Sequence, residues 1–181
     1  MKRKRVLLGT LVALLAVLAA GFLLPERLMI PVAGATSADW HHETFWYEPW
    51  GASGVHKGID IFAPEGRPVI AATPGLVVFV GDFGRGGLSV AVLGPKWRLH
   101  YYAHLSRADT AFGAWVARGV RLGAVGTTGN AVGKPAHLHY SILTLVPYPW
   151  RLRWVTQGWL LPVFLDPHEA LIAAQTYTKE Q

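Results

Sequence analysis

The stretch GLVVFVGDFGRGGLSVAVL (residues 75–93) predicts the fold class of this chain most directly. Two valine-rich apolar runs, residues 75–80 and 88–93, are separated by the glycine-rich residues 81–87. Valine favours strands and clustered glycines favour tight turns. The stretch therefore predicts two short strands joined by a turn.

The same pattern extends in both directions along the chain. Short runs rich in β-branched or aromatic residues occur at residues 68–72, 98–105, 120–125 and 136–144, with glycine- or proline-containing turns between them. No helical periodicity runs through residues 40–168, and only residues 168–176 predict a short helix. The composition, 51% hydrophobic and 15% charged, excludes a disordered chain. We therefore predict an all-β domain.

Three histidine-containing motifs stand out within this domain. They are HKGID (residues 56–60), YAHL (residues 102–105) and HLH (residues 137–139). Side chains two residues apart on a strand share one face, so His137 and His139 should project side by side. Imidazole and carboxylate ligands suit zinc. A single His-x-His motif is more often structural, so the prediction of a metal site depends on the three motifs together.

The remaining histidines carry weaker signals. His41 and His42 are interpreted as a surface pair, and His100 and His168 are expected to carry no chemistry. His100 shares strand parity with His104, so a supporting role for it stays open.

The order and spacing of the motifs resemble a known family. VHKGIDIFAPEGRPVIAATPGLVV (residues 55–78), YYAHLSR (residues 101–107) and VGTTGNAVGKPAHLHYSI (residues 125–142) are similar to the lysostaphin/LytM-type zinc metallopeptidases. These are peptidoglycan endopeptidases with a small open β-sheet core. Asp166-Pro167 matches the family's closing Asp-Pro, whereas Tyr140-Ser141 stands where the family commonly has Phe-Glu.

The resemblance implies a role for five residues. His56, Asp60 and His139 would hold one zinc ion per chain, and His104 and His137 would be the two catalytic histidines beside the metal. It also implies hydrolysis of amide bonds in the cross-links or stem peptides of peptidoglycan by a metal-activated water. Two alternatives stay open at this point. One is a non-catalytic member that binds and activates other wall hydrolases, and the other is a zinc peptidase that acts on proteins.

The amino terminus predicts a membrane segment. Residues 2–5 are four consecutive cations, and residues 6–24 are 19 residues without a charge. As a helix they would span about 28 Å, close to the thickness of a bilayer's hydrocarbon core. An uncleaved anchor is favoured over a signal peptide, although Ala33-Gly34-Ala35 has the form of a cleavage site. Either interpretation places the domain outside the cytoplasm: anchored in the cytoplasmic membrane of the bacterial cell envelope, or secreted if the segment is cleaved.

The net charge and the absence of cysteine limit which partners and which kinds of site this protein can have. Residues 2–5 supply four of the net +6 charges, and Glu26 and Arg27 cancel, which leaves +2 for residues 28–181. A net charge this small does not indicate a basic surface that binds nucleic acid. The absence of cysteine excludes disulfides and thiolate zinc sites. We expect a monomer with an anchor at residues 1–24, a linker at 25–39, a peptidase domain at 40–168 and a tail at 169–181.

Tryptophans cluster on both sides of the zinc motifs in the sequence. Three lie within residues 40–50 and three within residues 150–159. The sequence leaves open whether these two clusters pack in the core, line the rim of a groove or rest at a membrane interface.

Overall fold

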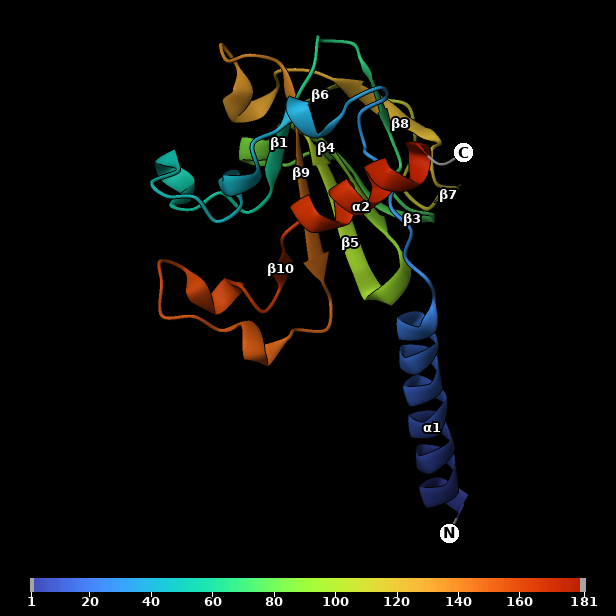
Figure 1. The fold of residues 1–181 in the computed structure, drawn as a ribbon. Helices are drawn as coiled ribbons and strands as arrows, with labels where there is room; N and C mark the ends of the chain where they lie inside the picture. The colour runs from blue at the N-terminus through green and yellow to red at the C-terminus, as the bar shows by residue number, and fades with distance from the viewer. Residues whose placement is uncertain (1, 180–181) are drawn as a thin grey trace.

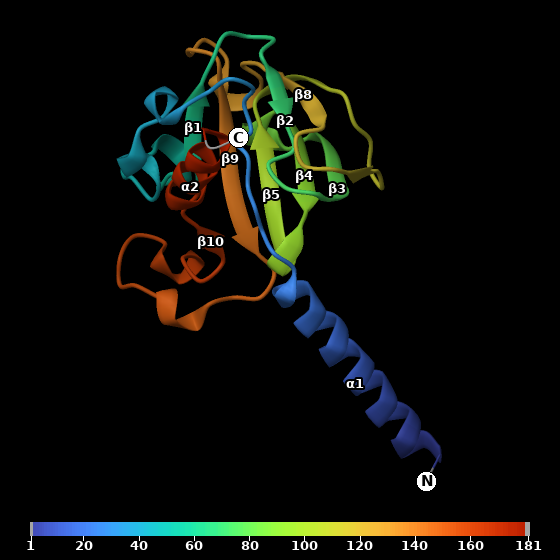
Figure 2. The same cartoon turned by 45° about the vertical axis from the view of Figure 1, so that its right-hand side comes forward.

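The computed structural model describes residues 2–179 and shows two antiparallel β-sheets with a helix at each end of the chain (Figures 1 and 2). The larger sheet has seven strands in the order β1-β9-β5-β4-β3-β7, with β10 paired to β9 outside this path. The smaller sheet has three strands in the order β2-β8-β6. The predicted all-β fold is confirmed: the domain is built on these two sheets, and both helices lie outside them.

The elements have the following bounds. The larger sheet contains β1 (Ile59–Phe62), β3 (Gly75–Asp82), β4 (Leu88–Leu93), β5 (Arg98–Ala103), β7 (Trp115–Val116), β9 (His137–Thr144) and β10 (Phe164–Leu165). The smaller sheet contains β2 (Pro68–Ile70), β6 (Leu105–Ala108) and β8 (Arg121–Val125). The helices are α1 (Lys2–Leu23) and α2 (His168–Lys179).

The predicted strand over residues 98–105 is interrupted at His104, where the chain passes from β5 in one sheet to β6 in the other. His104 has a φ of 63°, in the left-handed region that side-chain-bearing residues adopt only at a cost. Its backbone N–H donates to the carbonyl of Gly86 at 2.8 Å. The break therefore places His104 at the junction of the two sheets.

Both sheets contribute to one hydrophobic core. Ile61 of β1 and Leu138 of β9 are fully buried together with Val69 of β2 and Leu122 of β8. The hydroxyl of the fully buried Tyr102 accepts a hydrogen bond from the backbone N–H of Ala72 at 2.9 Å. A core shared in this way fixes the strands that carry the histidine motifs relative to one another.

Residues 25–39, predicted to be a linker, instead pack against the domain. Val32 is 1% exposed and bridges to Val69 of β2. The N–H of Met29 donates to Ala72 O at 2.8 Å, and the N–H of Ile70 donates to Pro31 O at 2.9 Å. Proline and glycine exclude regular structure here, but they do not prevent an extended segment from pairing with a sheet edge.

The predicted tail, residues 169–181, is also largely helical. Leu171 of α2 is fully buried, and the side chain of Gln175 accepts from the N–H of Ser37 at 2.8 Å. The tail therefore packs on the segment that precedes the domain; residues 180–181 lie outside the described part of the chain.

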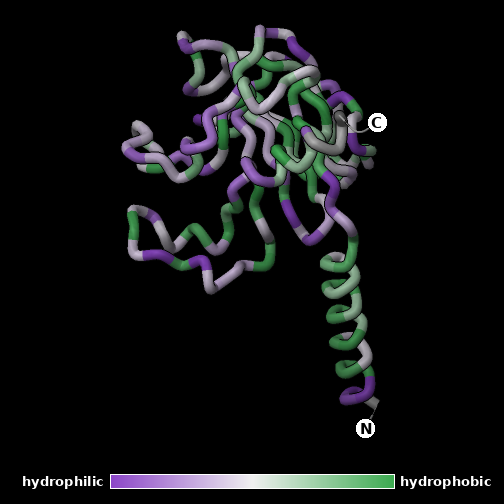
Figure 3. The backbone as a smooth tube through the Cα atoms, in the orientation of Figure 1, coloured by the Kyte–Doolittle hydropathy of each residue, from purple (hydrophilic) through white to green (hydrophobic). Residues whose placement is uncertain are grey.

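Helix α1 extends away from the sheets, and its residues are mostly hydrophobic beyond the cationic first turn (Figure 3). Its last turns contact the β4–β5 turn, where Trp97 Nε1–H donates to Leu18 O at 2.9 Å. Gly21 permits this contact, since a Cβ there would lie 2.2 Å from the indole of Trp97. Within the described residues, α1 is the one helix long and apolar enough to cross a membrane.

A buried carboxylate ties the residues after α1 to β5. Glu26 pairs with Arg98 and contacts Nε2 of His100 at 3.2 Å. Burial alone would raise the pKa of Glu26, but His100 and Arg98 outweigh it and lower that pKa. His100 also contacts the hydroxyl of Tyr140 at 2.7 Å. His100 thus has a structural role and does not lie beside His104. The strand ends before His104, so the two residues do not alternate on one face of a continuous strand.

Candidate metal centre and active site

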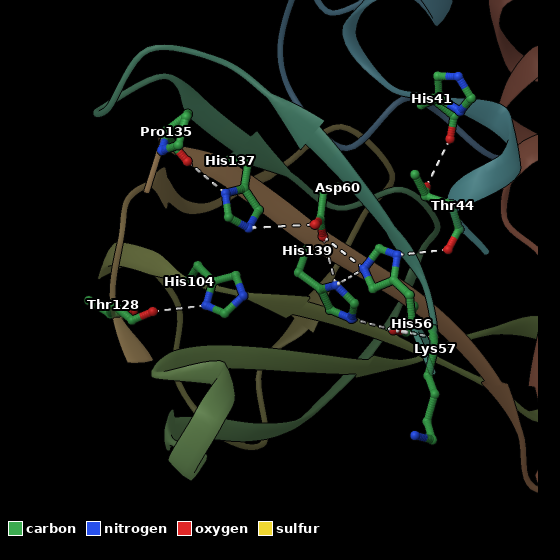
Figure 4. A network of polar contacts seen from close by, with 11 residues as sticks. His41, Thr44, His56, Lys57, Asp60, His104, Thr128, Pro135, His137 and His139 are labelled. Carbon is green, nitrogen blue, oxygen red and sulfur yellow. Dashed lines mark hydrogen bonds and ion pairs between the residues drawn. The ribbon is translucent and has the colours of Figure 1, made fainter. Parts of the chain in front are cut away.

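Three predicted zinc ligands converge at the paired strands β1 and β9 (Figure 4). Asp60 of β1 lies directly opposite His139 of β9 in the ladder, and His56 precedes β1 by one turn. His56 Nε2 is 3.1 Å and His139 Nδ1 is 2.9 Å from Asp60 Oδ1. One donor atom of each residue therefore lies close enough to the other two for all three to bind a single metal ion.

The hydrogen bonds behind this cluster determine which ring nitrogens carry protons. A backbone carbonyl only accepts, so the 2.9 Å contact of His56 Nδ1 with Thr44 O places the ring proton on Nδ1. The hydroxyl of Ser141 donates to Lys57 O at 2.8 Å, so it accepts from His139 Nε2–H at 3.0 Å. In neutral rings, lone pairs on His56 Nε2 and His139 Nδ1 then face each other at 3.0 Å.

Two lone pairs and a carboxylate oxygen at these distances repel one another unless a cation lies among them. Burial lowers the pKa of His139 despite the opposing effect of Asp60, so this ring is not itself the cation. Burial alone would raise the pKa of Asp60, but its contacts with His139 and His56 lower it, which keeps the carboxylate charged. Two imidazole nitrogens and one carboxylate oxygen are a ligand set that catalytic zinc takes. The residues present therefore fit a zinc ion.

The two predicted catalytic histidines line the same site from different elements. His137 begins β9, and its Nε2 is 3.8 Å from Asp60 Oδ2. His104 lies across the site, with its ring centre 5.0 Å from that of His137 and 6.0 Å from that of His139 (Figure 4). Desolvation by burial lowers the pKa of His104 to about 4, so its ring is neutral near pH 7.

Backbone carbonyls orient both of these rings in the same way. His104 Nδ1–H donates to Thr128 O at 2.8 Å, and His137 Nδ1–H donates to Pro135 O at 2.8 Å. Thr128 and Pro135 both belong to the glycine-containing segment that leads into β9. In the neutral rings, each Nε2 is consequently the nitrogen free to accept a proton.

A groove with a volume of about 950 Å³ contains the site. Its walls include the aromatic residues Trp50, Phe79, Phe83 and Tyr101 and the cations Lys57 and Lys134. Trp50 stacks on the ligand His56, with ring centres 4.1 Å apart. A groove of this size, lined by aromatic side chains and by the polar groups of the site, is large enough for a peptide.

Sequence reasoning missed the role of Ser141. This residue is 2% exposed, and its hydroxyl is the acceptor that fixes the tautomer of His139. The signal was available, because His137, His139 and Ser141 alternate on one face of a strand. Trp50 and the carbonyls of Thr44, Thr128 and Pro135 carried no such signal, since their contacts depend on how loops fold over the sheet.

We expect Ser141→Ala to weaken zinc binding about 10–100-fold, because His139 loses the acceptor for its Nε2–H. Competition with a calibrated chelator measures this affinity. Thr144→Ala is the matched control, since Thr144 lies on the same strand, is also 2% exposed and donates to a carbonyl away from the site. Equal zinc affinity in the two variants would contradict the role assigned to Ser141.

Comparison with known proteins identifies the family. The model of Peptidase family M23 matches residues 54–146, which contain all five predicted site residues. The DD-carboxypeptidase/endopeptidase Mpg of Neisseria meningitidis serogroup B is 41% identical over 86 residues, 48% of this chain and 19% of that protein. The L-Ala--D-Glu endopeptidase of Bacillus subtilis is 31% identical over 133 residues, 64% of this chain and 41% of that protein. The chain thus spans less than half of either relative.

Solved structures agree with this comparison. The catalytic domain of the antimicrobial peptidase lysostaphin from Staphylococcus simulans has a TM-score of 0.56 and 26% sequence identity, covering 68% of this chain and 84% of that domain. The predicted resemblance to lysostaphin and LytM-type peptidases and their open β-sheet core is therefore confirmed. Because the family match extends over more than half of its residues, the chain belongs to peptidase family M23, a family of zinc metallopeptidases.

Proposed function

We propose that this protein is a zinc-dependent endopeptidase that hydrolyses amide bonds in the cross-links or stem peptides of peptidoglycan. The observation that carries the proposal is the convergence of His56 Nε2, His139 Nδ1 and the Asp60 carboxylate, with the Nε2 atoms of two further histidines beside them. Relatives named as DD-endopeptidase and L-Ala--D-Glu endopeptidase support the substrate class.

The chain's own residues supply the proton transfers. A zinc ion held by His56, Asp60 and His139 would provide a Lewis acid and lower the pKa of water in its coordination sphere. His104 is neutral near pH 7 and accepts a proton from the attacking water at Nε2. The proton held by His104 passes to the amide nitrogen as the C–N bond breaks. His137 holds its own proton on Nδ1 against Pro135 O, so its Nε2 accepts the second proton of the attacking water and leaves the new carboxylate.

The groove positions the peptide for this reaction. Aromatic side chains that line it bury the peptide's apolar surface, and the site histidines line the same groove. The side chains of Asp60 and His139 are only 12% and 18% exposed, and this partial burial strengthens the interactions made there. A peptide held across the groove therefore presents its carbonyl carbon between the metal ligands and the two catalytic histidines.

We expect purified peptidoglycan treated with the full chain and zinc to release pairs of fragments that carry one new amino and one new carboxyl terminus. Mass spectrometry of the fragments identifies the bond. Unfolded casein, incubated in parallel, tests the protein-peptidase alternative. Cleavage of casein without release of wall fragments would show that the protein acts on proteins and not on peptidoglycan. A zinc-loaded chain that cleaves neither would instead support a non-catalytic activator of other hydrolases.

The proposal includes an uncleaved membrane anchor, α1. A signal peptide can pass the same test of length and composition, but cleavage after Ala35 would also remove residues that the fold uses. Val32 is buried against β2, and Met29 and Pro31 make backbone hydrogen bonds with the domain. Glu26 is likewise paired with Arg98 and His100 of β5. We therefore infer that α1 stays attached, with residues 2–5 on the cytoplasmic side and the groove outside.

A further inference from the structure

The tryptophan loop, residues 145–163 between β9 and β10, contains the most exposed large apolar side chain of the peptidase domain and several others close to it in sequence. Trp154 is 98%, Trp150 is 73% and Trp159 is 69% exposed, and Leu145, Leu152 and Val155 are each at least half exposed. Apolar side chains gathered in this way mark a surface that meets a partner or a membrane.

The exposed side chains stand on an ordered loop. Trp46 Nε1–H donates to Thr156 O at 3.1 Å, and Gln157 Nε2–H donates to Ser53 O at 3.0 Å. Arg151 donates to the carbonyls of Leu161 at 3.1 Å and Phe164 at 3.3 Å. The loop's backbone is therefore fixed, while the indoles of Trp154 and Trp159 remain directed to the outside.

The two tryptophan clusters differ in environment. In the first cluster, Trp40 is 6% exposed and donates to His168 Nδ1 at 3.1 Å, and Trp50 stacks on His56. These tryptophans serve the fold and the site. The second cluster has no comparable burial, so packing accounts for the first cluster and leaves the second to be explained.

The loop leaves the larger sheet at the end where α1 is attached. The N–H of Leu145 donates to Trp97 O at 2.9 Å, and the indole of the same Trp97 donates to Leu18 O in α1 at 2.9 Å. Two hydrogen bonds thus connect the first residue of the loop to the last turns of the helix. Figures 1 and 2 show the loop and α1 at the same end of the domain.

The loop's charge suits a membrane surface. Residues 145–163 contain Arg151 and Arg153 and no acidic residue. Arg153 is exposed between the exposed Leu152 and Trp154. Tryptophan is favoured at the interface between headgroups and hydrocarbon, and arginine pairs with lipid phosphates.

We propose that the tryptophan loop inserts its exposed indoles into the outer interface of the membrane that α1 crosses, with an anionic lipid bilayer as its partner. The inference rests on the proposed anchoring by α1. Two attachments, a helix and a loop, fix the domain's orientation as one attachment does not. The loop also forms hydrogen bonds with Trp46 and Ser53, which lie close in sequence to Trp50, the residue stacked on His56. Contact between the loop and the membrane therefore sets how the groove faces the wall.

The test uses the absence of cysteine in the chain. Single cysteines are introduced in the full chain by Trp154→Cys, Trp159→Cys, Trp115→Cys and Ala13→Cys, spin-labelled, and reconstituted in phosphatidylethanolamine–phosphatidylglycerol vesicles. Trp115 is the matched control: it is 73% exposed but lies on β7, away from the loop. Ala13 lies in the middle of α1 and reports the anchor itself. Collisions with oxygen report lipid, and collisions with a water-soluble nickel complex report water.

We expect labels at positions 154, 159 and 13 to lose nickel accessibility relative to position 115. If positions 154 and 159 are as accessible to nickel as position 115 while position 13 is protected, the loop proposal fails and the anchor stands. If position 13 is accessible too, the anchor fails with it. Labels on the loop that stay in water and become immobilised by peptidoglycan fragments would make the loop a wall-binding surface and overturn the proposal. Wall hydrolysis by each labelled chain verifies that it is folded.

Discussion

His139→Ala, Asp60→Ala and His56→Ala should each remove zinc from the protein and abolish wall hydrolysis. Each substitution removes one of the three donor atoms that the structure brings together. The two that remain are too few to hold the zinc ion. We expect the loss of affinity to exceed the roughly 10–100-fold typical of residues behind the ligands. Elemental analysis after exhaustive dialysis gives zinc per chain, one in the parent protein and close to none in the variants.

His42→Ala is the matched control for these ligand variants. His42 is exposed, and its ring contacts Glu43 at 3.8 Å on the surface, so zinc content and hydrolysis should remain at the parental level. Zinc bound to the folded state stabilises it, so a chelator should lower the melting temperature of the parent and of His42→Ala. The same chelator should leave His139→Ala unchanged. Full zinc content in all three ligand variants would refute the metal centre.

His104→Asn and His137→Asn should keep zinc and lose about 10²–10⁴-fold in the rate of wall hydrolysis, the typical cost of removing one acid–base group. Neither ring provides a donor atom to the cluster formed by His56, Asp60 and His139. The rate is measured from the release of peptidoglycan fragments under saturating zinc, and zinc content is measured in the same preparations.

Asparagine is chosen at position 104 because of the backbone there. His104 adopts a φ of 63°, which asparagine tolerates better than alanine does. The asparagine amide can also donate to Thr128 O in place of Nδ1–H, so the junction between β5 and β6 should persist. Loss of activity with an unchanged melting temperature then reports proton transfer. A near-parental rate for His104→Asn or His137→Asn would mean that this residue has no catalytic role.

Much of the sheet could be predicted because its strands have local signals. The valine-rich runs at residues 75–80 and 88–93 became β3 and β4, and the run at 136–144 became β9. The two-residue strands β7 and β10 were missed, since they are too short for any alternation to appear. The contacts that residues 25–39 make with the domain could not be predicted for a related reason. An irregular backbone that pairs with a neighbouring strand has the same local composition as one that is free.

The motifs around His56, Asp60, His104, His137 and His139 identified the family, and the structure brings these five residues to one groove. Their individual roles stay predictions until the variants are measured.

The sequence by itself determined the residue types of the metal centre, the β-rich body and the apolar helix, because each depends on side-chain chemistry or on a short repeat. Only the tertiary structure decided which nitrogen of each ring is free, since Thr44 and Ser141 approach His56 and His139 through long-range contacts. It also separated the tryptophans, burying Trp40 and leaving Trp154 exposed. Identical indoles acquire different environments from the packing of segments far apart in the chain, and no local pattern records that packing.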